Sequence, residues 1–168
     1  MAGRTIIAIQ IHQPGVEIFD QVSADLPRGL ELLVGADAAP VAEHGAIPNV
    51  PGVYLFSEQD QPIYVGQTRK LRQRLGNHVN PLGKNNQATF AFLVAKAEAQ
   101  KAGVDIAQYR SQLEADQQFV AHFQAAKLRV SEMDVRYIEI DGEIERALFE
   151  IYAALLLNTL VFNSFETH

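Results

Sequence analysis

The stretch GVYLFSEQDQPIYVGQ, residues 52–67, contains two short runs rich in aromatic and aliphatic residues. The first run is GVYLFS (52–57) and the second is PIYVGQ (62–67), and the polar residues Glu58–Gln61 separate them. Runs of this composition are typical of strands, and a short polar connection favours antiparallel pairing. The stretch therefore predicts a β-hairpin with a four-residue loop.

Each predicted strand carries one tyrosine. Tyr54 lies on the first strand and Tyr64 on the second, so the hairpin would bring the two phenols near each other on the sheet. Tyrosine is common in strands, where its ring packs in the core. Taken alone, either tyrosine is ordinarily a packing residue. A catalytic role is favoured only if other reactive side chains lie nearby.

The chain after the hairpin predicts helices and one further strand. Thr68 is a plausible N-cap for a helix that runs to about Gly76 or slightly beyond. Apolar periodicity predicts helices over about 86–102, 105–128 and 143–157 and an alternating strand over 133–140. This order of elements predicts an α+β fold in which helices flank a small three-stranded antiparallel sheet.

The first fifty residues have a different character. Thr5–Ile11 is a β-branched run that suits a strand, and Leu30–Val34 is a short apolar segment that suits a helix. Prolines and a glycine then punctuate the connection to the hairpin. We therefore expect residues 1–50 to form an extension packed on a core domain, residues 51–168, which carries a helical insertion at about 86–128.

The composition is that of a globular protein. Of the 168 residues, 48% are hydrophobic and 20% are charged, and none is cysteine, which excludes disulfides, thiolate nucleophiles and cysteine-ligated zinc. The longest apolar run, Ile151–Leu157, is far shorter than the roughly 18 residues of a membrane span. The start of the chain is too polar for a secretory signal. We therefore expect a cytoplasmic protein that does not contact a membrane.

The net charge of −6 argues against a nucleic-acid partner, but its distribution does not. No acid occurs between Gln61 and Ala97, and that segment carries six basic residues: Arg69, Lys70, Arg72, Arg74, Lys84 and Lys96. The segment therefore carries +6 and the remainder −12. Such a segment predicts a positive face for phosphates, although a solvated basic helix explains the charge equally well.

Three polar residues stand out downstream of the hairpin. Glu150 is the only charged residue between Ala147 and Phe165, and an isolated carboxylate among apolar residues needs an ion pair, a hydrogen bond or a cation. An ion pair with Arg146 or an exposed helix edge would also explain it. Arg74 and His78 lie four residues apart and share a face if their helix continues.

Together these groups are more specific than any one of them. In order and spacing they resemble the GIY-YIG nuclease family over about residues 51–163, through the following positions: Gly52-Val53-Tyr54, Tyr64-Val65-Gly66, Arg74, His78, Glu150 and Asn163. The resemblance implies a three-stranded antiparallel sheet with flanking helices. It also implies a site for metal-dependent hydrolysis of phosphodiester bonds.

The resemblance implies a role for the charged residues of that site. Glu150 would hold one divalent cation, Mg²⁺ or Mn²⁺, because Mg²⁺ prefers oxygen ligands and retains several waters. Arg74 would contact the phosphate oxygens through its guanidinium group. Asn163 would orient the chain end against the site.

The resemblance also implies a proton-transfer role for the tyrosines. Tyr54 would be the general base toward the attacking water and Tyr64 would position the phosphate or the water, and the reverse assignment is equally open. A phenol has an ordinary pKa near 10, so either base needs help from nearby positive charge. His78 would relay the proton from the tyrosine or hold the water.

The expected substrate is DNA, which would contact four basic residues: Arg69, Lys70, Arg72 and Lys84. Gln67 departs from the family, since many relatives carry lysine there, and this removes a charge near the site. No separate DNA-reading module is evident, so selectivity would come from the domain, a homodimer or a partner subunit. The alternative is a catalytically inactive GIY-YIG-like module that binds nucleic acid or protein.

Overall fold

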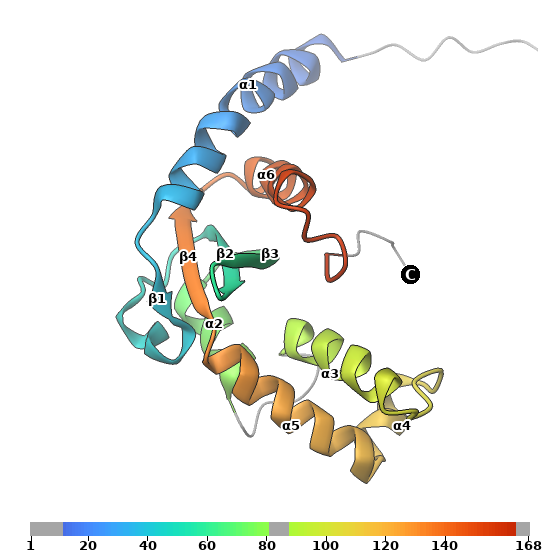
Figure 1. The fold of residues 1–168 in the computed structure, drawn as a ribbon. Helices are drawn as coiled ribbons and strands as arrows, with labels where there is room; N and C mark the ends of the chain where they lie inside the picture. The colour runs from blue at the N-terminus through green and yellow to red at the C-terminus, as the bar shows by residue number, and fades with distance from the viewer. Residues whose placement is uncertain (1–11, 81–87, 164–168) are drawn as a thin grey trace, which may run out of the picture.

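The computed structural model describes residues 12–80 and 88–163 and has an α+β architecture (Figure 1). The elements in chain order are α1 (Gln13–Gly35), β1 (Ala39–Pro40), the 3-10 helix η1 (Val41–Ala46), β2 (Gly52–Glu58), β3 (Gln61–Thr68), α2 (Leu71–Val79), α3 (Thr89–Lys101), α4 (Arg110–Ala115), α5 (Gln117–Ser131), β4 (Asp134–Glu139) and α6 (Glu143–Leu156). The predicted fold class is confirmed.

Within the described residues, the sheet contains four strands in the order β1-β4-β2-β3, all antiparallel to their neighbours. Three of them are the predicted hairpin strands and the predicted alternating strand. The fourth, β1, is a two-residue addition that pairs Ala39 with Val135 and Pro40 with Asp134. Since β2 lies between β3 and β4, residues on β2 occupy the middle of the sheet.

The hairpin turn is tighter than its polar sequence predicts. Glu58 and Gln61 pair with each other as strand residues, so the loop contains only Gln59 and Asp60 instead of four residues. Both loop residues have positive φ, 52° and 61°. This is the left-handed backbone of the two-residue turns whose twist matches that of the strands.

The alternation of side chains along the strands divides the core between the two faces of the sheet. Tyr54 and Phe56 point to the face covered by α2, α3 and α5. Val53 and Leu55 point to the opposite face, where α1 and α6 pack. A side chain at Gly29 of α1 would collide with the ring of Phe149 of α6, so this glycine allows the two helices to cross closely.

Several boundaries differ from those predicted. The helix expected over 105–128 is two helices, because Asp116 accepts hydrogen bonds from two backbone N–H groups and begins α5 as its N-cap. The segment 30–34 is the end of the 23-residue helix α1. The strand expected over Thr5–Ile11 lies outside the described residues. None of the helices in residues 12–80 and 88–163 combines the length and apolarity needed to cross a bilayer.

Candidate active site

The hydroxyl group of Tyr54 lies at the meeting point of β2 and α2. His78 Nε2 is 2.9 Å from this oxygen, and Arg74 Nε donates to it at 3.4 Å. Tyr54 and His78 are both fully buried. The expected continuation of the helix through Gly76 holds, since α2 extends to Val79 and places Arg74 and His78 on one face.

The position of α2 is set by hydrogen bonds to the preceding segment. Leu71 N–H donates to the carbonyl of Val50, and Gln73 N–H donates to the side chain of Asn49. These bonds satisfy N–H groups that a helix start leaves without partners. The predicted N-cap at Thr68 is wrong, because the capping position is Lys70, whose N–H donates to Thr68 Oγ1.

Tyr64 lies beside Tyr54, as expected from the hairpin. Their ring centroids are 6.2 Å apart, and Tyr64 is 8% exposed. Gly66, opposite Tyr54 in the register, is needed for this arrangement, because a Cβ there would lie 2.4 Å from Tyr54 Cζ. The glycine therefore makes room for the buried phenol.

Burial and the charge of Arg74 have opposite effects on the pKa values of the two tyrosines and the same effect on that of His78. Burial raises the pKa of Tyr54, while the Arg74 guanidinium acts in the opposite direction. Burial raises the pKa of Tyr64 as well. Burial, followed by the charge of Arg74, lowers the pKa of His78 to about 3. At neutral pH His78 is therefore a neutral imidazole, and both phenols are protonated before any ligand adds charge.

Glu150 faces this group from α6. It is half-buried, and burial raises the pKa of its carboxyl group, whereas hydrogen bonding by Gln67 and the charge of Arg74 act to lower it. Arg146, the ion-pair partner considered from the sequence, donates instead to the backbone carbonyls of Ile140 and Asp141. The carboxylate of Glu150 therefore interacts electrostatically with Arg74 and the two tyrosines.

This donor set suits one weakly ligated divalent cation. Across residues 12–80 and 88–163, no three His, Cys, Asp or Glu side chains gather in a group able to hold a metal ion. Mg²⁺ does not require such a group, because it retains several waters and binds through one or two carboxylates. Glu150, half-buried and with a pKa raised by burial, is a group that a cation would stabilise in its charged form.

The match to a protein family covers this site. Residues 50–154 match the family model of the GIY-YIG catalytic domain, which is more than half of the chain. The chain belongs to the GIY-YIG family. It is 40% identical over 43 residues to the UvrABC system protein C of Deinococcus radiodurans, an alignment that covers 26% of this chain and 7% of that protein. No solved structure matches the chain.

The GIY-YIG family is a family of nucleases, and its members generally depend on divalent metals. Asn163 lies nine residues beyond the matched segment and binds back to the domain. Its Oδ1 accepts from Val65 N–H at 3.0 Å, and its Nδ2 donates to the Val65 carbonyl at 2.6 Å. Asn163 therefore ties the end of the described chain to β3, the strand that carries Tyr64.

The basic residues predicted to contact nucleic acid are differently engaged in this GIY-YIG domain. Arg69 forms an exposed ion pair with Glu143 at 2.7 Å, and Arg72 Nε donates to the Ile47 carbonyl. Lys70 is exposed at the start of α2. Lys84 lies outside the described residues.

One of the described residues, Phe90, touches the site but was not predicted from the sequence. Phe90, at the start of α3, stacks on Tyr64 with ring centroids 4.5 Å apart and an interplanar angle of 16°. It is fully buried. A phenylalanine in a helix carries no signal that separates it from any other core residue, so only the structure brings it to the site.

Proposed function

We propose that this GIY-YIG protein is an endonuclease that hydrolyses phosphodiester bonds of DNA with the help of one divalent cation. The arrangement around the Tyr54 hydroxyl carries the proposal, since His78 and Arg74 both bond to that oxygen and Glu150 lies within electrostatic reach. A buried phenol with two nitrogen partners is positioned to change its protonation state during a reaction.

Tyr54 is the general base in this proposal. Tyr54 first loses its own proton to bulk water, and its phenolate oxygen then takes a proton from the attacking water. The water oxygen forms a bond to phosphorus, and the bond to the leaving oxygen breaks with its electron pair remaining on that oxygen. Because burial raises the pKa of Tyr54, the phenolate requires donors that stabilise it. Arg74 supplies one such donor, and the planar fork of a guanidinium group matches the geometry of phosphate oxygens.

His78 acts as the second donor to Tyr54. With a pKa lowered to about 3, it does not readily accept a proton, so a relay that ends on an imidazolium is unfavourable. The tautomer with a proton on Nε2 donates to the Tyr54 oxygen and stabilises the phenolate. The low pKa therefore argues against the proton relay, one of the two roles open from the sequence, and the contact with Tyr54 adds a third role, that of stabilising the phenolate.

Glu150 holds the divalent cation, and Mg²⁺ or Mn²⁺ fits its single carboxylate. Such a cation, when bound, stabilises negative charge on the phosphate and on the leaving oxygen. Gln67 keeps the carboxylate oriented, since it hydrogen-bonds to Glu150. Tyr64 positions the phosphate or the water beside Tyr54, and Asn163 holds the strand that carries Tyr64.

The nucleic acid lies over the start of α2 in this proposal, where Lys70 and Arg69 are exposed. Arg72 and Lys84 complete the contact surface predicted from the sequence. In this proposal residues 1–50 are an extension of the nuclease domain, residues 51–168, and the protein is cytoplasmic. Its selectivity comes from a homodimer or a partner subunit.

Cleavage of supercoiled plasmid tests the function. Wild-type protein with Mg²⁺ is expected to nick or linearise the plasmid, and EDTA is expected to abolish this activity. Tyr54→Phe is expected to lower the rate at least 100-fold, since a positioned general base contributes about 10²–10⁴. Glu150→Gln is expected to lower it by a similar factor, because it removes the negative charge that would hold the cation. Tyr152→Phe is the matched control, because it removes a phenol two residues along α6, on the other face of the helix.

Two outcomes would reject the nuclease. One is intact DNA across Mg²⁺, Mn²⁺ and a panel of duplex, single-stranded and branched DNA and RNA. The other is equal cleavage by the wild type and Glu150→Gln. Salt-dependent binding without cleavage, unchanged in Glu150→Gln, would instead support the non-catalytic binding module.

A further inference from the structure

The helical insertion contributes an aromatic wall to the candidate active site. Phe90 of α3 stacks on Tyr64 and also contacts the ring of His78 edge-on at 6.3 Å. On its other sides Phe90 packs against Phe56 at 5.4 Å and Phe162 at 5.5 Å. The ring of Phe90 is therefore fixed by neighbours from the sheet and from the end of the described chain.

We infer that Phe90 is a positioning residue, which holds the phenol of Tyr64 at the angle needed to align phosphate or water with Tyr54. The inference rests on the proposed nuclease function. A stacked pair with an interplanar angle of 16° restricts rotation of the Tyr64 ring about its side-chain bonds. Tyr54 lies 6.2 Å away at 53° to Tyr64, so it does not provide the same flat support.

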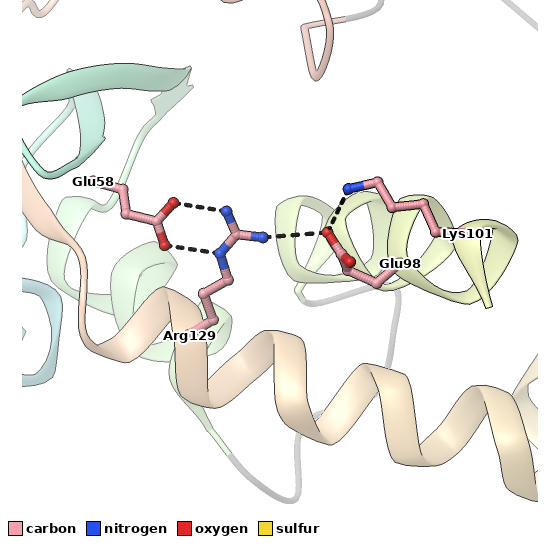
Figure 2. Close-up of polar contacts among 4 residues, drawn as sticks. All are labelled: Glu58, Glu98, Lys101 and Arg129. Carbon is pink, nitrogen blue, oxygen red and sulfur yellow. Dashed lines mark hydrogen bonds and ion pairs between the residues drawn. The ribbon is translucent and has the colours of Figure 1, made fainter.

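The far end of α3 is fixed to the same hairpin by charge. Arg129 of α5 donates to both oxygens of Glu58 on β2, at 2.8 and 2.6 Å, and its Nη1 lies 3.5 Å from Glu98 of α3 (Figure 2). Lys101 lies 3.0 Å from the same Glu98 oxygen. Bidentate pairing of arginine with a carboxylate fixes orientation as well as distance.

The hairpin and the insertion are thus joined at two points. Phe90 meets Tyr64 near the start of α3, and Glu98 reaches Glu58 through Arg129 two turns later. These two attachments connect both ends of α3 to the hairpin. The insertion therefore completes the wall around Tyr64 in addition to any role in selectivity or partner binding.

Substitution of Phe90 by leucine tests the inference, because leucine fills most of the volume but cannot stack. We expect Phe90→Leu to lower kcat about tenfold with KM changed less than twofold, since misalignment of a positioned group slows the chemical step. Phe90→Met is a second ring-deleting variant, whose flexible side chain preserves packing if leucine prevents folding. It should have the same effect on kcat.

Phe119→Leu is the matched control. Phe119 is equally buried in the same insertion and pairs with Phe92 at 5.2 Å, not with a candidate site residue. Its loss should lower stability in a comparable way and leave kcat within twofold of wild type. Equal slowing of cleavage by Phe119→Leu and Phe90→Leu would overturn the inference, because it would reduce Phe90 to a general packing role.

A spectroscopic arm requires no activity. In a sample with isotope-labelled tyrosine, the ring resonances of Tyr64, assigned with Tyr64→Phe, should carry a ring-current shift from Phe90. That shift should disappear in Phe90→Leu and Phe90→Met and persist in Phe119→Leu. Unchanged Tyr64 resonances would overturn the positioning role. If wild-type protein cleaves nothing, the proposed nuclease fails, while this arm still decides whether Phe90 holds Tyr64.

Discussion

Burial determines the protonation state of the His78 imidazole. His78 is fully buried, it touches Tyr54 through Nε2, and its Nδ1 lacks a hydrogen-bond partner within the described part of the chain. Because charging it inside the protein is costly, its pKa falls to about 3. Such a residue serves as a neutral hydrogen-bonding group across the physiological range, unlike an exposed histidine.

This enclosure predicts that acid destabilises the protein through His78. The unfolded chain binds the proton with a pKa near 6.5 and the folded chain only near 3, so stability is lost as the pH falls from above 6.5 toward 3. Between pH 7.5 and 5 the loss from this residue is about 2 kcal/mol, at about 1.4 kcal/mol per unit. Urea unfolding at both pH values measures it.

His78→Gln should reduce that pH-dependent loss, although the variant is less stable at pH 7.5. His122→Gln is the matched control, because it removes a histidine that is only half-buried and lies outside the candidate site. Burial raises the pKa of Glu150, which acts in the opposite direction, but the effect is common to wild type and both variants. The same pH dependence in wild type and His78→Gln would show that His78 is protonated when folded.

Local pattern predicted most elements of the fold. The hairpin, the alternating strand 133–140 and the last helix each depend on side chains that match their own backbone period, and all three are observed. What pattern did not predict depends on partners far along the chain. The start of α2 is determined by the Val50 carbonyl, and β1 exists only because β4 lies beside it.

The candidate site follows the same division. The order and spacing of Tyr54, Tyr64, Arg74, His78 and Glu150 carried the resemblance, since a motif is a property of sequence. Individual contacts could not be predicted in this way. No motif announces the hydrogen bond from Arg72 to the Ile47 carbonyl or the stacking of Phe90 on Tyr64.

At the level of elements, the bonds of Asn163 to β3 should contribute to the free energy of unfolding. Asn163→Ala leaves both the N–H and the carbonyl of Val65 without their partner, in a site where Asn163 is 5% exposed. An unpaired buried polar group costs about 1–3 kcal/mol, so we expect a loss of about 2–4 kcal/mol in the free energy of unfolding. Chemical denaturation measures this loss.

Asn49→Ala provides the comparison. Asn49 also accepts a backbone N–H, from Gln73, but in an exposed position where water replaces it. Its loss should cost less than about 1 kcal/mol. If both variants lose the same stability, the bonds of Asn163 to Val65 contribute no more than a surface contact.

For the whole molecule, net charge opposes the binding of DNA. The protein carries −6 in total, and Arg69 and Arg72 of its basic segment already have partners within the fold. With two or three phosphates neutralised, affinity for duplex DNA should fall about 10- to 50-fold between 50 and 200 mM salt. Fluorescence anisotropy with a labelled duplex measures the dependence.

Lys70→Ala should reduce the slope of that salt dependence by about one contact, and Lys101→Ala should leave it unchanged, because Lys101 pairs with Glu98 on α3. Affinity independent of salt would show that phosphates are not contacted. The same slope in both variants would place the duplex away from the start of α2.

The side chain of Asn163 also has a consequence for self-association. In the sheet β3 is an outer strand, and such a strand offers bare peptide groups onto which foreign strands can be templated. The side-chain amide of Asn163 hydrogen-bonds to both the N–H and the carbonyl of Val65, and so replaces the bonds that a neighbouring strand would make there. This side chain therefore interrupts the line of unpaired backbone groups on β3 at which a strand of a second copy would begin to pair.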